Sequence, residues 1–232
     1  MISIDYIAQG FKEAINLLIS FDKEIYEIIF LSLFVSTSAT IIASLIFIPM
    51  GIHLGIKDFK GKKAFSRILY TFMSTPSVVV GLLVAILLSR RGPFGYLDLM
   101  YTPKAMIIAQ TLLVSPLILG LTYSLSKNRG KEIQKIGITL GASKLDIIIL
   151  VTRELKIDLI VNIVTAFSRA ISEVGAVMIV GGNIKNKTRV ITTAISMMNS
   201  MGEYPMAIAL GLVLLIISFG INSLIYSYSG ED

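Results

Sequence analysis

The sequence predicts an all-α, polytopic membrane protein with about five transmembrane helices, and three observations support this fold class. First, hydrophobic residues make up 54% of the 232 residues and charged residues only 16%, whereas soluble domains average about 25% charged residues. Second, the apolar residues gather in five segments of the roughly 20 residues that a membrane helix needs. Third, lysines and arginines lie in short clusters between these segments, as in loops beside a membrane. A single soluble domain with a large core is the disfavoured alternative.

Composition also limits the chemistry. The sequence has no cysteine, which excludes disulfides and cysteine-ligated metals, and His53 is its only histidine. We therefore expect no metal site and no cofactor, and we interpret His53 as a residue near the membrane–water interface. The net charge of +6 does not indicate a nucleic-acid partner, because the basic residues lie between apolar segments. Asp5, in place of a basic leader, argues against a cleavable signal peptide.

An amphipathic helix is predicted over residues 3–19. Its apolar residues recur at helical spacing, and polar residues such as Lys12 and Asn16 fall largely on the remaining face. The pattern fits two interpretations equally. The helix lies in the membrane interface, or it packs on other helices of the same chain.

Five membrane helices are expected after it. They span about 25–54, 66–88, 103–125, 159–180 and 205–226. The first three contain Pro49, Pro76 and Pro116 in turn. Proline within a membrane helix frees backbone carbonyls that neighbouring helices must satisfy, which indicates a packed bundle. Because no repeat and no separate soluble domain is visible, we expect one transmembrane domain over residues 1–232.

The distribution of lysine and arginine predicts the orientation of the chain. The loops after the first and third membrane helices together carry twelve of these residues, and the loops on the other side carry eight. The side richer in lysine and arginine usually faces the cytoplasm. Five crossings then place the N-terminus outside and the C-terminus in the cytoplasm.

The longest connection, residues 126–157, is expected to form a helical hairpin in the cytoplasm. Apolar residues at helical spacing up to Leu140 give a short helix, which "GAS" interrupts. A second helix follows over Leu145–Leu155, with Ser143 as its candidate N-cap. An exposed apolar ridge between basic flanks suits helix-in-groove docking. The alternative is a hairpin that lies on its own helix bundle.

The centre of this loop resembles the cytoplasmic coupling segment of ABC importer permeases, often called the EAA loop. The resemblance is carried by "TLGASKLDII", in which Gly141 holds the position of the family's glycine. Both ends depart from the family: residues 135–137 are Lys-Ile-Gly instead of Glu-Ala-Ala, and residues 153–154 are Arg-Glu instead of Leu-Pro. The resemblance implies that the centre of the loop docks an ATPase. Its residues are Gly137, Leu140, Gly141, Ala142, Ser143, Lys144 and Leu145.

Two other segments resemble the molybdate- and tungstate-type members of this family. They are "TPSVVVGLLVAILLSRRGPFG" (Thr75–Gly95) and "RAISEVGAVMIVGGNIKNKTRVITTAI" (Arg169–Ile195). The resemblance extends over roughly residues 25–225, and the ending "TRVITTAI" looks most like tungstate-type permeases. It implies the membrane-spanning subunit of an ATP-driven importer for a tetrahedral oxyanion, most closely tungstate. The same role for molybdate or sulfate is the alternative.

The chain itself shows no means of hydrolysing ATP. It lacks the phosphate-cradling Gly-x-x-x-x-Gly-Lys-Ser/Thr loop, and no nucleophile–base pair stands out, so we expect no catalytic residues. The resemblance implies three kinds of partner: two copies of an ABC ATPase, an extracytoplasmic oxyanion-binding protein and a second copy of the permease. It also implies alternating access in the cell membrane.

The segment "SRAISEVGAVMIVGGN", residues 168–183, places two charges within an apolar run. Arg169 and Glu173 are four residues apart and therefore share one helix face. Charged residues within a membrane usually face the bundle or a wet cavity. The pair is either a structural ion pair that fixes helix packing or, together with Gly175, a border of the translocation path near its gate.

The loop after this segment is the expected docking site of the binding protein, as the resemblance implies. Its candidate residues are Gly181, Gly182, Asn183, Lys185, Lys187 and Arg189. The two glycines are expected to turn the chain. The three basic side chains could attract an anion or an acidic docking face, and ordinary solvated loop charges are the alternative.

Two other classes of function remain open. An ion-coupled secondary transporter would show inverted repeats and broken helices, for which only Pro76 and Pro116 offer a hint. A membrane-embedded enzyme would need paired catalytic residues on different helices, and the acid and base candidates lie on one helix only. The second of these classes also includes a membrane scaffold.

Overall fold

The computed structural model describes residues 4–229, with side chains described from residue 11 to residue 221 and at Ser223. Every regular element in that part of the chain is helical. The elements are α1 (Ile4–Ile19), α2 (Lys23–Ile56), α3 (Lys62–Met73), α4 (Ser77–Leu88), a 3-10 turn η1 (Gly95–Leu97), α5 (Pro103–Leu125), a π-helical turn η2 (Ser126–Gly130), α6 (Lys131–Thr139), α7 (Lys144–Glu154), α8 (Lys156–Ile171), α9 (Gly175–Gly181), α10 (Ile191–Met201) and α11 (Tyr204–Ser229). Residue 3 of the expected amphipathic helix and both ends of the expected domain lie outside the described residues.

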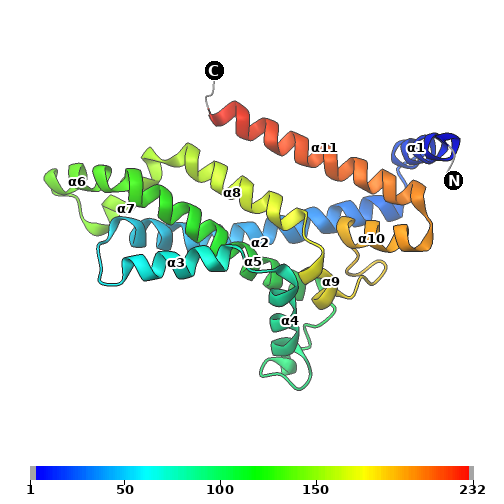
Figure 1. The fold of residues 1–232 in the computed structure, drawn as a ribbon, viewed down its shortest axis with the longest axis horizontal. Helices are drawn as coiled ribbons and strands as arrows, with labels where there is room; N and C mark the ends of the chain where they lie inside the picture. The colour runs from blue at the N-terminus through cyan, green and yellow to red at the C-terminus, as the bar shows by residue number, and fades with distance from the viewer. Residues whose placement is uncertain (1–3, 230–232) are drawn as a thin grey trace.

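The helices form an elongated bundle (Figure 1). Helices α2, α5 and α8 run along its long axis and pack against one another, and α11 lies alongside them. Helices α6 and α7 form one end of the bundle, whereas α1 and α10 lie at the opposite end. Helix α4 projects sideways from the bundle. The expected cytoplasmic hairpin and the loop after α9 therefore lie towards opposite ends of the molecule.

Small residues bring α2 and α5 into close contact. A β-carbon added at Gly51 would lie 2.9 Å from Cβ of Thr122, and one added at Gly55 would lie 2.7 Å from Cβ of Ser126. Such distances are too short for real β-carbons, so the separation of these helices requires glycine at both positions. Close backbone approach of this kind stabilises helix pairs in lipid, where hydrophobic burial provides little driving force.

Three helical stretches are long and apolar enough to cross a membrane on their own. They are Lys23–Ile56, Pro103–Thr139 and Tyr204–Ile221. Two further crossings are reached if each of two bent helix pairs counts as one span, which gives up to five. The fold class predicted from the sequence is therefore confirmed, and α5 begins and ends at the expected residues 103 and 125.

The segment expected as one helix over 66–88 is broken by a 90° bend between α3 and α4. Pro76 stands at the break with an extended backbone, φ −61° and ψ 133°, and it precedes the first residue of α4. Proline also disfavours the helical conformation of the residue before it, here Thr75. The single helix expected over 66–88 is therefore wrong, because the chain breaks at Pro76 and turns α4 away from the bundle.

The segment expected over 159–180 is also broken, by 57° between α8 and α9. The local cause is Glu173, whose Oε1 accepts a hydrogen bond from the backbone N–H of Ala176 at 3.2 Å. A carboxylate placed there satisfies a free donor of the first turn of α9 and favours a new helix start. The break therefore falls at one of the two charges that the sequence placed in this run.

Helix α1 combines both interpretations of its amphipathic pattern. Ala14 is fully buried in a cluster with Ile25 of α2 and Leu210 of α11. Phe11 and Ile19 lie on the exposed part of its surface, at 43% and 69%. One face thus packs on the chain's own helices, and another keeps apolar side chains free to enter a membrane interface.

Candidate functional site

The hairpin at one end of the bundle continues directly from a central helix. Helix α5 passes through the π-helical turn η2 into α6, so that Pro103–Thr139 forms one helical stretch of 37 residues. Helix α7 then runs back and leads into α8. A displacement of the hairpin can therefore reach two helices of the bundle through the backbone.

Local chemistry fixes the tip of the hairpin. Gly141 has φ +80°, a backbone conformation that only glycine adopts without strain. Ser143 caps α7: its Oγ accepts from the Asp146 N–H at 3.3 Å, and Asp146 Oδ2 accepts from the Ser143 N–H at 3.0 Å. These hydrogen bonds from Ser143 hold the pKa of the exposed Asp146 carboxyl below its ordinary value. The turn and the N-cap expected from the sequence are both present.

The hairpin has one buried and one exposed apolar face. On α7, Ile147 and Val151 pack with Ile52 and Ile56 at the end of α2. The exposed apolar residues are Ile136, Ile138, Leu140, Leu145 and Ile149. Helix α7 thus rests on the bundle, as the second interpretation expected, while an apolar ridge is left uncovered. This exposed set is called the docking ridge below.

The candidate docking residues divide between these faces. Gly137 is buried under α7, where an added β-carbon would lie 3.4 Å from Ile147 Cγ1. Ala142 is half-buried. The remaining candidates are exposed around the hairpin tip: Leu140, Gly141, Ser143, Lys144 and Leu145.

The charged pair occupies the break between α8 and α9. Arg169 Nη1 lies 3.2 Å from Glu173 Oε2. Glu173 is buried, and its other oxygen caps α9. Its backbone carbonyl accepts a hydrogen bond from Thr192 Oγ1 of α10 at 2.6 Å. One residue thus holds α8, α9 and α10 together at this point.

Further contacts make the break a crowded junction. Gln110 of α5 donates from Nε2 to the carbonyl oxygen of Ala170 at 2.9 Å. A β-carbon added at Gly175 would lie 2.7 Å from Cγ2 of Val78 and 3.1 Å from Oγ of Ser77, both on α4. The structure therefore brings Arg169, Glu173 and Gly175 together, as the sequence predicted.

The loop after α9 is tightly folded. Gly181 is buried, and its carbonyl accepts from Thr188 Oγ1 at 2.6 Å. Gly182 has φ +71° and faces the Tyr101 ring, so an added β-carbon would lie 2.8 Å from Cδ1 of that ring. Asn183 follows with φ +51°. The two glycines thus turn the chain as expected.

The basic residues of this loop do not behave alike. Lys185 Nζ and Arg189 Nη1 contact the two carboxylate oxygens of Glu24 at 2.6 Å and 3.0 Å. Lys187 is exposed and lines a cavity of about 290 Å³ together with Glu24 and residues of α2. Glu24 was not singled out from the sequence, because it lies 161 positions before Lys185 and nothing local marks the pairing.

The described residues hold no group of three or more His, Asp or Glu side chains that could bind a metal ion. The arrangement consists instead of a helical hairpin with a docking ridge, a polar junction at the break between α8 and α9, and a loop that Glu24 holds towards the other end.

Comparison with known proteins agrees with this description. Residues 47–228 match the model of the family described as "Binding-protein-dependent transport system inner membrane component". The chain is 68% identical over 228 residues to the tungstate uptake system permease protein TupB of Peptoclostridium acidaminophilum, covering 98% of this chain and 100% of that protein.

Two other relatives are more distant. The chain is 39% identical to the tungstate uptake system permease protein TupB of Campylobacter jejuni, over 95% of this chain and 92% of that protein. It is also 39% identical to a probable anion ABC transporter permease protein of Haloferax volcanii, over 83% of this chain and 85% of that protein.

Proposed function

This chain belongs to the binding-protein-dependent transport family as an inner-membrane component, and we propose that it forms the tungstate-translocating path of an ATP-driven importer. Membership makes it a non-catalytic, multi-pass permease that works with an ATPase and a binding protein. The proposal adds the transported anion, the number of permease and ATPase copies in the complex, the orientation of the chain in the membrane, and the residues at the docking sites and the gate.

The substrate proposal depends on one observation. A protein that is 68% identical to this chain over its full length is named a tungstate uptake permease. Tungstate is a doubly charged tetrahedral oxyanion, and moving one charge from water into a low-dielectric medium costs on the order of 20 kcal/mol in the idealised limit. The anion therefore needs a hydrated, protein-lined path between helices.

We place the ATPase at the hairpin. The docking ridge keeps Leu140 and Leu145 at 79% and 73% exposure beside a turn that Gly141 fixes. Exposed leucines on a rigid tip suit a groove in a partner protein. Two ATPases that close on ATP would pull two such hairpins together and rock the helix bundles about the path.

A homodimer follows from the same reasoning. Up to five spans in one chain are few for enclosing a hydrated path. Helix α4 projects from the bundle and exposes apolar side chains, among them Val78, Leu82 and Ile86 at more than half of their surface. We propose that a second copy of the chain covers α4 and completes the path.

The orientation proposal combines charge and shape. The end with the hairpin holds most of the twelve loop lysines and arginines of the richer side, and we assign it to the cytoplasm. The N-terminus then lies outside and the C-terminus inside. The loop at residues 181–189 would meet the binding protein, with Lys187 as the exposed charge that can steer an acidic face or an anion.

The gate is proposed at the junction of α8 and α9. Arg169 would attract the anion briefly. The negative charge of Glu173 would keep the anion from binding there too tightly to be released. The half-exposed guanidinium beside a buried carboxylate supports this role. A purely structural ion pair is the competing explanation, and the variant Glu173→Gln distinguishes the two.

Uptake by the reconstituted complex tests the proposal. The permease, its ATPase and its binding protein are placed in vesicles, and tungstate, molybdate and sulfate uptake are compared with and without ATP. We expect ATP-dependent uptake that favours tungstate. Equal uptake of the three anions would reject tungstate as the preferred substrate. Uptake that is the same with and without ATP would reject the proposal of an ATP-driven importer.

A further inference from the structure

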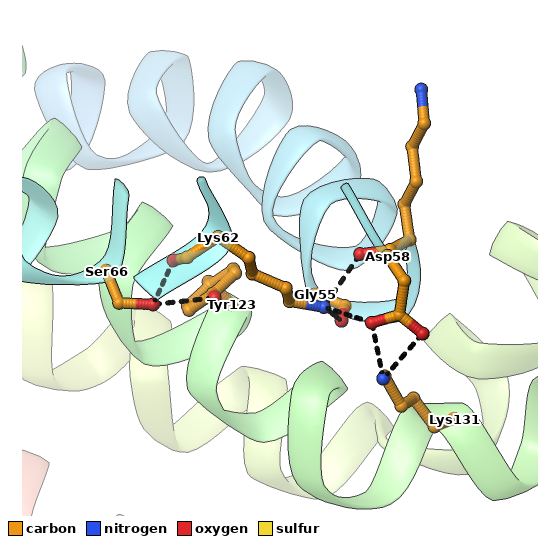
Figure 2. Close-up of polar contacts among 7 residues, drawn as sticks. Gly55, Asp58, Lys62, Ser66, Tyr123 and Lys131 are labelled. Carbon is orange, nitrogen blue, oxygen red and sulfur yellow. Dashed lines mark hydrogen bonds and ion pairs between the residues drawn. The ribbon is translucent and has the colours of Figure 1, made fainter. Parts of the chain in front are cut away.

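The side chain of Lys62 holds the loop between α2 and α3 (Figure 2). Its Nζ donates to the carbonyl oxygen of Gly55 at 2.6 Å and to that of Lys57 at 2.7 Å. These carbonyls lie at the C-terminal end of α2, where the helix dipole favours a cation. The side chain is only 14% exposed, so the ammonium is fixed in one place.

Aromatic rings fix the same ammonium from the sides. Its Nζ lies 6.0 Å from the centroid of Phe59 and 5.8 Å from that of Tyr123, within the range of cation–π contacts. Tyr123 of α5 is fully buried, and its hydroxyl is hydrogen-bonded to Ser66 Oγ of α3 at 2.7 Å. Lys62 is therefore anchored to α2, α3 and α5 together.

Asp58 extends this anchored group to the hairpin. Its two carboxylate oxygens accept from Lys131 Nζ at 2.6 Å and 2.9 Å, and Oδ1 also lies 3.5 Å from Lys62 Nζ. Hydrogen bonding to Lys131 holds the pKa of the Asp58 carboxyl below its ordinary value. Lys131 is the first residue of α6. A chain of three charges thus joins the α2–α3 loop to the base of the hairpin.

The covalent link at this point is the π-helical turn η2, Ser126–Gly130. Turns of this type are rare and often mark functional sites. A displacement of α6 could be absorbed by rearrangement of η2 before it reached α5. A second link, formed by side chains, would carry the displacement of α6 to the bundle even if η2 rearranged.

We infer that Asp58 and Lys131 form a strut that makes α6 move together with α2 and α3, with Lys62 as the positioning residue that anchors it. This inference rests on the proposed function, because it assigns the hairpin as the handle of the ATPase. Through the strut, a displacement of α6 reaches α3 and the bent α4. None of the three residues touches the anion or the ATPase in this role.

The strut is suited to a clean test because it contributes little to folding. Asp58 is 76% exposed, and exposed ion pairs add little stability. Asp58→Asn and Lys131→Gln should therefore assemble normally. In both, ATP hydrolysis should continue while the uptake of anion per ATP falls by about threefold or more, the scale on which such contacts alter coupling. The exposed Lys60→Gln, in the same loop, is the control and should match the wild type.

A crosslink separates a strut from a merely structural contact. The chain has no cysteine, so Asp58→Cys with Lys131→Cys creates the only two thiols in the permease. A short, uncharged, reducible crosslinker applied before the ATPase is added should restore the uptake per ATP, and a reductant should remove the gain. Wild-type uptake per ATP in the single variants, or no recovery on crosslinking, would overturn the inference.

A distance measurement keeps this test independent of the substrate. Spin labels at the exposed positions Lys63 of α3 and Glu132 of α6 report whether the two helices move together. With the ATPase bound, ATP should leave their distance unchanged in the wild type and should shift or broaden it in Asp58→Asn. If the wild type takes up no oxyanion, the proposed function fails, and this measurement still decides the strut. A distance that responds to ATP equally in both proteins would overturn it.

Discussion

Arg169 and Glu173 form an ion pair whose two ends lie in different surroundings. Their charged atoms are 3.2 Å apart, yet the Arg169 side chain is 44% exposed and that of Glu173 only 2%. A buried carboxylate that also caps α9 is held in place, whereas its partner retains freedom to meet a solute. The gate proposed at this junction depends on this asymmetry, and the variant Glu173→Gln tests it.

Glu173→Gln should change the rate of oxyanion uptake more than it changes assembly. The amide oxygen can still accept the hydrogen bond from Ala176, so the start of α9 is kept, but the charge that balances Arg169 is lost. Hydrogen bonds to charged groups are worth about 1.5–3 kcal/mol, which corresponds to a change in rate of about tenfold or more. Uptake by vesicles with equal amounts of complex measures it.

The matched control is Glu27→Gln, which removes a carboxylate from an exposed i,i+4 pair with Lys23. It should leave uptake unchanged. The opposite result is that Glu173→Gln forms less folded complex, while the complex that does form takes up oxyanion at the wild-type rate. This would show that the pair serves only to fix helix packing.

Gly81→Ala should destabilise the permease by about 1–3 kcal/mol, the usual cost of overpacking. The added β-carbon would lie 2.6 Å from the Cα of Ala176, a backbone atom that cannot rotate away. Helices α4 and α9 would have to separate. Thermal unfolding of the detergent-solubilised protein measures the loss.

Gly211→Ala on α11 is the control for that variant, because an added β-carbon there meets nothing within 4 Å. Alanine favours a helix over glycine by roughly 0.5–1 kcal/mol, so this variant should be equally or more stable. Equal melting temperatures for the two variants would show that the close contact of α4 and α9 is not maintained in the protein.

Leu140→Asn should weaken binding of the ATPase by about tenfold or more, as expected when a central apolar anchor is truncated. Leu140 is 79% exposed, so the permease itself should remain as stable as before. Titration of the ATPase onto immobilised permease measures the affinity. Tyr96→Ser, in the turn η1 after the projecting helix α4 and also 79% exposed, is the control and should bind normally. Equal affinity of both variants would remove the docking ridge from the interface.

The parts of the fold that local chemistry decides were predictable from the sequence. The hairpin turn follows from Gly141, its second helix from the cap at Ser143, and the start of α5 from a capping Thr102 followed by Pro103. The two breaks were not predicted. An apolar run through Pro76 looks continuous when only length and hydropathy are counted, and the 90° turn depends on where α4 finds contacts.

The candidate site, like the fold, contains some residues that the sequence makes visible and others that it does not. Arg169 and Glu173 are visible in the sequence because their spacing alone makes them neighbours on a helix. Glu24 and Asp58 are not visible, since their partners Lys185 and Lys131 lie far along the chain and meet them only after the helices pack. Single charges in loops give no sign of which opposite charge they will meet.

Glu24→Gln should loosen the loop at residues 181–189 without unfolding the bundle. Glu24 holds Lys185 and Arg189 through both of its carboxylate oxygens, and its own side chain is 23% exposed. A contact worth about 1 kcal/mol would make opening of the loop roughly fivefold more frequent. Trypsin, which cleaves after lysine and arginine, should cut the loop faster at Lys185 and Arg189.

The nearby Glu27→Gln, whose partner is Lys23, should leave the rate unchanged. If Glu24→Gln is cut no faster than the wild type, the hydrogen bonds of Thr188 hold the loop on their own. In that case Glu24 serves to neutralise two of the loop's cations, which leaves Lys187 to meet the partner.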